Sequence, residues 1–141
     1  MQPKPEFTSI SPGNLVAVTE IDLGALAEIY DEMDIYLSIY MKSASSTDLD
    51  ASRSHISSRF RVMEKSLPSE LRESFQKTIS LAQEAIESPS WKGERSRVIL
   101  ASSPESFLHV YRMGLKTEPL VVLDTSPFLL PLAKLRDDYL D

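Results

Sequence analysis

Two basic clusters contain the side chains of this 141-residue chain that are best suited to binding chemistry. The first lies on or near one expected helix and consists of Arg53, Arg59, Arg61 and Lys65. The second follows the single tryptophan, Trp91, and consists of Lys92, Arg95 and Arg97. If the clusters converge, they form a positive patch on which Trp91 can stack against a base or a guanidinium group. Because glutamates are interspersed among these cations, a solvated helix surface explains the same pattern.

Side chains for catalysis and metal binding are scarce. The chain has no cysteine, which excludes disulfides, a thiolate nucleophile and cysteine-ligated metals. Of the two histidines, His55 has arginine neighbours that disfavour a metal ion, and His109 is expected on the more exposed face of a strand. None of the motifs HExxH, GxGxxG, GxxxxGK[ST] or GxSxG occurs. We therefore expect no enzyme, cofactor or metal site; a small-molecule enzyme would need a pocket that holds His109 or perturbed acids.

The composition is typical of one globular domain, with 42% hydrophobic residues and a net charge of −6. An acidic balance disfavours an extended nucleic-acid surface but leaves room for a local basic patch. No apolar run reaches about 18 residues, so no membrane-spanning helix is expected. Residues 1–14 are polar and rich in proline, which predicts a flexible lead-in rather than a signal peptide. A single domain over 15–141 follows, and the lack of cysteine suits a cytoplasmic location.

Hydrophobic periodicity defines the expected elements. Helical spacing predicts a helix from Ile21 to Met33 and a pair of helices on either side of residues 67–69. Runs rich in β-branched and aromatic residues predict strands at 35–41, 97–101, 107–111 and 120–123. Residues 15–19 fit either a short strand or an apolar segment lying on the core. Residues 42–50 read as a polar loop, and Pro127, capped by Ser126, is expected to open the last helix.

The order of these elements restricts the fold. The short link at 67–69 predicts an antiparallel helical hairpin, and the turn at 102–106 predicts a β-hairpin. A purely parallel sheet does not accommodate that β-hairpin. We therefore expect an α/β fold with a mixed, largely antiparallel four-stranded sheet on which the helical hairpin and the C-terminal helix pack.

The succession IYLSIYM, polar loop, helical hairpin, RVILAS, FLHVYRM and LVVLDTSPFLLPLAKL resembles the N-terminal domain of eukaryotic-type class 1 peptide chain release factors. It is most similar to their archaeal and bacterial release-factor-like relatives, a group that includes peptidyl-tRNA-cleaving proteins. The resemblance covers roughly 35–140. It implies a non-catalytic α/β domain, normally followed by covalently linked middle and C-terminal domains. The hydrolytic GGQ motif of the middle domain is absent here.

Two departures from the family bear on stop-codon decoding. Release factors read stop codons with an NIKS motif at the hairpin tip, where this chain has MEKSLP at 63–68, and only Lys65 and Ser66 match. A second motif, YxCxxxF, falls around 121–128, where Val121 and Leu123 replace the tyrosine and the cysteine. The resemblance therefore implies a placement role without codon reading.

The leading hypothesis is a domain that places a larger translation or ribosome-rescue factor on the ribosome or tRNA. Its expected contact residues are Arg53, Arg59, Arg61, Lys65 and Ser66. The alternative is a protein-interaction or dimerisation module with no RNA role, which predicts concentration-dependent association and an exposed apolar patch. The sequence leaves the oligomeric state open.

Overall fold

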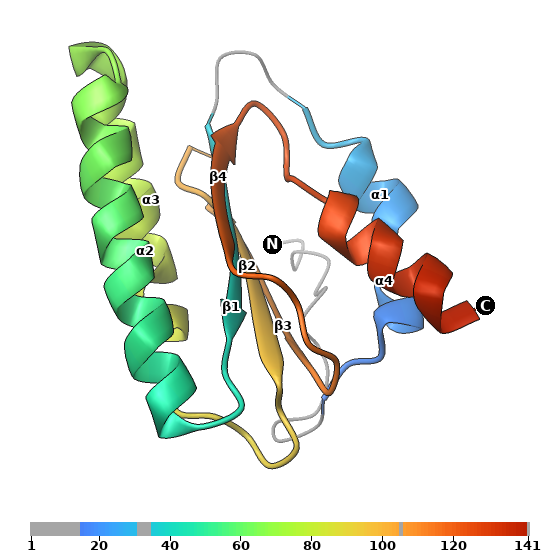
Figure 1. Cartoon of the computed structure of the whole chain (residues 1–141). Coiled ribbons are helices and arrows are strands. Elements are labelled where there is room, and N and C mark those ends of the chain that lie inside the picture. Colours follow the sequence, from blue (N-terminus) through green and yellow to red (C-terminus); the bar gives the residue numbers. More distant parts are fainter. Residues whose placement is uncertain (1–14, 31–34, 105, 141) are drawn as a thin grey trace, which may run out of the picture.

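The computed structural model has three layers, with one four-stranded sheet between two sets of helices (Figure 1). It describes residues 15–30, 35–104 and 106–140, so the expected lead-in over 1–14 lies outside the described residues. The strands are β1 (Tyr36–Lys42), β2 (Ser96–Ser102), β3 (Phe107–Met113) and β4 (Leu120–Asp124). Their order is β3-β2-β1-β4, and every neighbouring pair is antiparallel. The expected α/β class with a largely antiparallel four-stranded sheet is confirmed, and the parallel pairing that a mixed sheet would contain does not occur among the described strands.

The two central strands, β1 and β2, form the core of the sheet. Ile39 of β1 lies opposite Ile99 on one side and Val121 on the other, and all three are buried. Strand β2 is buried at every position, as a strand covered on both faces should be. The β2–β3 hairpin follows the expected turn, where Ser106 adopts a positive φ of 49°.

The helical hairpin covers one face of the sheet and consists of α2 (Ser46–Ser66) and α3 (Ser69–Glu87) (Figure 1). Its apolar stripes meet the odd-numbered side chains of β1 in one core, and Phe60 and Phe75 pack edge to face at 5.9 Å. The polar loop expected over 42–50 is shorter in the structure, because β1 ends at Lys42 and α2 begins at Ser46. The hydroxyl of Ser45 accepts the Asp48 amide at 3.1 Å, which starts α2 inside that stretch.

The opposite face is covered by a 3₁₀ turn, η1 (Val18–Glu20), and by the helices α1 (Leu23–Ala27) and α4 (Leu130–Leu140) (Figure 1). Residues 15–19 form no strand but lie on the core, where the Val16 amide donates to the Arg112 carbonyl. The helix expected from Ile21 to Met33 has a described α-helical part of only five residues, α1. Its expected continuation through 31–34 lies outside the described residues.

The last helix begins three residues later than expected. The Phe128 amide donates to the Ser38 hydroxyl at 2.9 Å, and the Tyr40 hydroxyl donates to the Phe128 carbonyl. Both backbone groups of Phe128 are thus satisfied by side chains of β1 rather than by a helix. Pro127 is therefore buried against the sheet, and α4 opens at Leu130 with Pro131 in its first turn.

Candidate functional site

The predicted cation Arg53 lies at the base of the hairpin, where it binds the end of α3. Its Nε donates to the Ile86 carbonyl at 3.0 Å, and one Nη donates to the Glu87 carbonyl at 2.8 Å. Carbonyls at a helix C-terminus have no partner within the helix, so a guanidinium there satisfies them and complements the helix dipole. Arg53 therefore serves the fold, about 18 Å along α2 from Lys65 by helical rise.

Arg97, which the sequence placed in the second basic cluster, is fully buried at 0% exposure. Its Nε donates to Glu94 Oε2 at 2.9 Å, and its other nitrogens donate to the carbonyls of Ala85, Ser88 and Pro89 at 2.8, 2.9 and 3.1 Å. Burial alone would raise the pKa of Glu94, but hydrogen bonds, including those from the Trp91 amide and Arg97, hold that pKa below its usual value.

The guanidinium group that stacks on Trp91 comes from this chain rather than from a bound molecule. The guanidinium of Arg112, on β3, lies 4.2 Å from the centre of the Trp91 ring and also contacts Glu94 Oε1 at 3.1 Å. Arg53 and Arg97, one residue from each sequence cluster, both bind the end of α3. Their convergence point is inside the fold, so it forms no positive surface patch.

A positive site does form at the tip of the hairpin. Arg61 and Lys65, four residues apart on α2, share a hollow of about 270 Å³ with Glu64 and with Arg72 of α3. The Arg72 Nε donates to the Leu67 carbonyl at 3.2 Å, which holds its guanidinium beside the turn. Among the described residues, no acidic side chain lies within 4.0 Å of the charged nitrogens of these three cations. Arg72 was not in the predicted set; its place one turn into the second helix was the only available signal.

The remaining predicted residues lie outside this hollow. Arg59 is half-buried and lies two residues before Arg61, which puts it about 200° around the helix. Ser66 is exposed but its hydroxyl donates to the Val62 carbonyl of its own helix at 3.1 Å. Of the five predicted contact residues, the structure therefore brings together only Arg61 and Lys65.

His109 is buried, contrary to the expectation that it faces solvent. Its ring stacks on Phe107 at 4.2 Å and meets the Tyr111 ring edge to face at 6.1 Å, on the side of the sheet that η1, α1 and α4 cover. Burial lowers the pKa of His109 to about 4. The reason is topological: the odd positions of β3 face this second core, a relation that the β3 sequence alone does not reveal.

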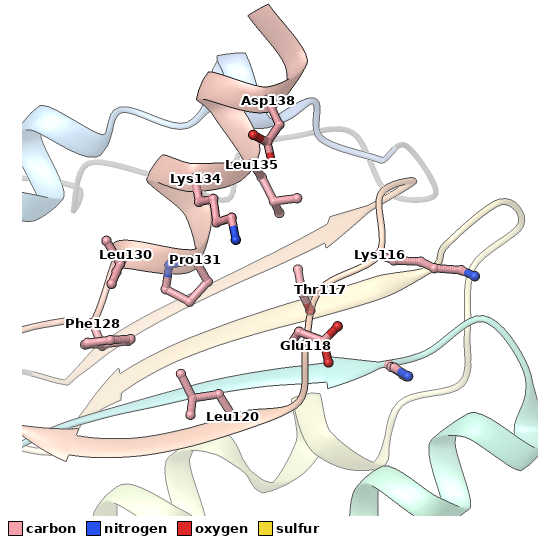
Figure 2. Close-up of a pocket in the computed structure, with 11 residues that line it drawn as sticks. Lys116, Thr117, Glu118, Leu120, Phe128, Leu130, Pro131, Lys134, Leu135 and Asp138 are labelled. Atoms are coloured by element: carbon pink, nitrogen blue, oxygen red, sulfur yellow. The ribbon is translucent and has the colours of Figure 1, made fainter. Parts of the chain in front are cut away.

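A second concavity lies between α4, the start of β4 and the loop that precedes β4 (Figure 2). Its volume is about 490 Å³, within the range of small-molecule sites. The wall is mostly apolar, and three lysines and two acids stand around it. Its lining residues are Lys42, Lys116, Thr117, Glu118, Leu120, Phe128, Leu130, Pro131, Lys134, Leu135 and Asp138. We call it the α4 groove.

Thr117, in the wall of the α4 groove, leads to a stability prediction. It is 6% exposed, and its hydroxyl has no hydrogen-bond partner among the described residues. An unpaired buried hydroxyl is costly, so Thr117→Val should raise the free energy of unfolding by about 1 kcal/mol. Thr117→Ser keeps the hydroxyl and loses a methyl group, so it should lower that free energy by about 0.8 kcal/mol. Urea unfolding of the two variants measures both signs; a destabilised valine variant would mean that the hydroxyl is bonded.

The comparisons with known proteins add no relative. No protein-family model matches the chain, and no curated protein shows significant similarity to it. Within residues 15–30, 35–104 and 106–140, no three acidic or histidine side chains gather closely enough to hold a metal ion. None of the helices in this part of the chain has both the length and the apolar character needed to cross a bilayer.

Proposed function

We propose that this chain is a non-catalytic domain of a release-factor-like protein and that it helps to place a larger translation or ribosome-rescue factor on the ribosome or tRNA. The contact is made by the tip of the helical hairpin. The observation that supports this proposal most directly is the gathering of Arg61, Lys65 and Arg72 around one hollow. The cations stand on an otherwise acidic chain with a net charge of −6.

The tip has the properties that a phosphate-binding surface needs. The hairpin extends past the ends of the strands in Figure 1, so its tip stands clear of the sheet. A hollow of about 270 Å³ is several times the roughly 30 Å³ that one water molecule occupies in the liquid, so it admits a phosphate group. Lysine and arginine together supply most of the affinity in such contacts, largely by releasing counterions from the nucleic acid.

The positions that correspond to the two codon-reading motifs argue for placement on the ribosome rather than for codon reading. Lys65 is the one exposed, uncommitted residue of the two that match the NIKS motif, since the Ser66 hydroxyl is bonded to its own helix. Val121, at the expected position of the second codon-reading motif, is buried beneath the hairpin at 4% exposure. A codon base could not reach it without opening the core.

Charge reversal at the tip tests the proposal. The full chain is titrated with ribosomes and with tRNA over a salt series, alone and with Arg61→Glu plus Lys65→Glu. For single-stranded or loop RNA, each lost phosphate contact reduces the slope of log affinity against log salt by about 0.7, so the double variant should reduce it by about 1.4. Lys92→Glu lies at the opposite end of the hairpin and changes the charge by as much as one of the two tip reversals. It is the control and should leave the slope unchanged.

Two results would contradict the proposal. One is no binding at low salt, and the other is equal loss of affinity in the tip and control variants. In either case a mass that rises with protein concentration would favour the protein-interaction module instead. Leu130, 68% exposed on α4, is where such an association would be sought first.

A further inference from the structure

The α4 groove lies on the layer opposite the helical hairpin, so a function there is independent of RNA contact at the tip (Figures 1 and 2). Its wall combines one aromatic ring, Phe128, with the aliphatic surfaces of Leu120, Pro131 and Leu135. Leu130 stands at its margin and is 68% exposed. An exposed leucine beside an apolar concavity is the kind of surface that a ligand with an apolar body can cover.

The charges around the α4 groove select the sign of the ligand. Three lysines, Lys42, Lys116 and Lys134, outnumber the two acids, Glu118 and Asp138. Among the described residues, none of these lysines has an acid within 4.0 Å of its amino group. In Figure 2 the amino group of Lys134 points from α4 toward the sheet, into the space beside Thr117. The groove is therefore locally positive on a chain whose net charge is −6.

Thr117 adds a polar group that the fold leaves without a partner. Its side chain extends from the loop toward α4 in Figure 2, and its buried hydroxyl finds no partner within the part of the chain that the structure describes. The hydroxyl and methyl groups of a threonine exchange places among staggered rotamers, so a change of χ1 can turn the hydroxyl toward the groove. An oxygen acceptor placed beneath Lys134 would then satisfy it.

We propose that the α4 groove binds a small amphiphilic carboxylate. The carboxylate lies between the Lys134 amino group and the Thr117 hydroxyl, and an aromatic or branched aliphatic body covers Phe128 and Pro131. Hydrogen bonds to charged groups fix the head, and burial of apolar surface supplies the remaining affinity. The described residues that line the groove include neither an arginine nor a glycine, so the bidentate and Gly-rich backbone contacts typical of nucleoside phosphates are missing and a carboxylate is the better match.

The test uses 4-phenylbutanoate as probe and its neutral amide, 4-phenylbutanamide, as the matched control ligand. Titration of the full chain, followed by amide NMR shifts, should perturb residues 116–118 and 130–135 and leave the hairpin tip unchanged. Because a hydrogen bond to a charged group contributes about tenfold in affinity, the amide should bind about tenfold more weakly. Lys134→Gln should weaken 4-phenylbutanoate by a similar factor and leave the amide unaffected.

Control variants separate the groove from general effects. Lys77→Gln, an equal change on α3 of the opposite layer, should leave binding of 4-phenylbutanoate unchanged. Leu130→Ser, at an exposed position, should weaken both probes without unfolding the chain. Equal affinities for acid and amide, shifts outside the groove, or indifference to Lys134→Gln would each overturn the proposal. So would binding to phosphatidylglycerol vesicles without binding to the free acid, which would assign this face to a membrane surface.

Discussion

Arg97→Met is expected to lower the free energy of unfolding by about 3–5 kcal/mol, the largest effect of any substitution considered for this chain. The methionine fills much of the space of the arginine but leaves Glu94 as a buried charge with one fewer partner. It also removes one donor each from the carbonyls of Ala85, Ser88 and Pro89. The Ser88 carbonyl keeps Arg53 and the Pro89 carbonyl keeps Arg112, so the Ala85 carbonyl loses most. The cost therefore comes from groups left unpaired inside the fold, not from the ion pair alone.

Urea denaturation of matched variants checks this expectation. Lys77→Met breaks an exposed pair with Glu73 on α3, and such pairs contribute about 0–1 kcal/mol, so this control should remain near wild type. The double variant Arg97→Met plus Glu94→Gln should lose less unfolding free energy than the sum of the two single losses, because the buried charge is then gone. A loss below about 1 kcal/mol for Arg97→Met would show that the network is not part of the stable core.

Acid should destabilise the protein in two overlapping pH windows, the first set by His109. In the unfolded chain a histidine titrates near 6.5, whereas burial lowers the pKa of folded His109 to about 4. Between these values the unfolded state binds more protons than the folded state, so stability falls as pH falls from 6.5 to 4. The shift corresponds to a loss of up to about 3 kcal/mol. Glu94, whose pKa is lowered from 4.5, adds a second loss below that value.

The measurement is the free energy of unfolding at several pH values. Around pH 5.2 the contribution of His109 should have a slope close to 1.4 kcal/mol per pH unit, the value for one proton. His109→Gln should remove this contribution, because the amide does not titrate. His55→Gln makes the same substitution at an exposed position on α2 and serves as the matched variant. An unchanged slope in His109→Gln would mean that the folded protein protonates this ring as readily as the unfolded chain does.

The Tyr111 hydroxyl gives the same expectation a structural basis. It lies 3.2 Å from Nδ1 of His109, and burial, with a smaller contribution from Asp22, raises the pKa of Tyr111 to about 12. The phenol therefore keeps its proton and can donate to the neutral imidazole. A doubly protonated imidazole has no acceptor left for this bond.

Local pattern was sufficient to predict most of the elements. The helical hairpin follows from helical spacing, and strands β1 to β4 follow from runs of β-branched and aromatic residues with clear breaks at their ends. The β2–β3 turn and the antiparallel sheet followed from short links. The predicted start of the last helix at Pro127 was wrong, although a proline is a usual sign of a helix start. Distant partners decide it: Ser38 and Tyr40 of β1 bind Phe128, so α4 begins later.

The candidate sites were harder to predict for the same reason. Arg97 stands between Ser96 and Val98 and reads as one of several surface cations, yet its side chain is buried at the end of α3. Arg61 and Lys65 were predicted because both belong to a basic cluster on one expected helix. Arg72 joins them only across the hairpin, and the α4 groove combines β1, β4, a loop and α4. Sequence alone does not bring such segments together.

The way in which the hairpin is fastened gives it the mechanics of a lever. Its 19-residue helix α3 rises about 28 Å, and the Phe60–Phe75 contact joins the two helices over the sheet core. At the far end Arg97 ties the terminal carbonyls of α3 to the central strand β2. A sideways force on the hairpin tip is thus passed along α3 to Arg97. It acts there on the start of the central strand β2. Softening that joint would let the tip bend without turning the domain.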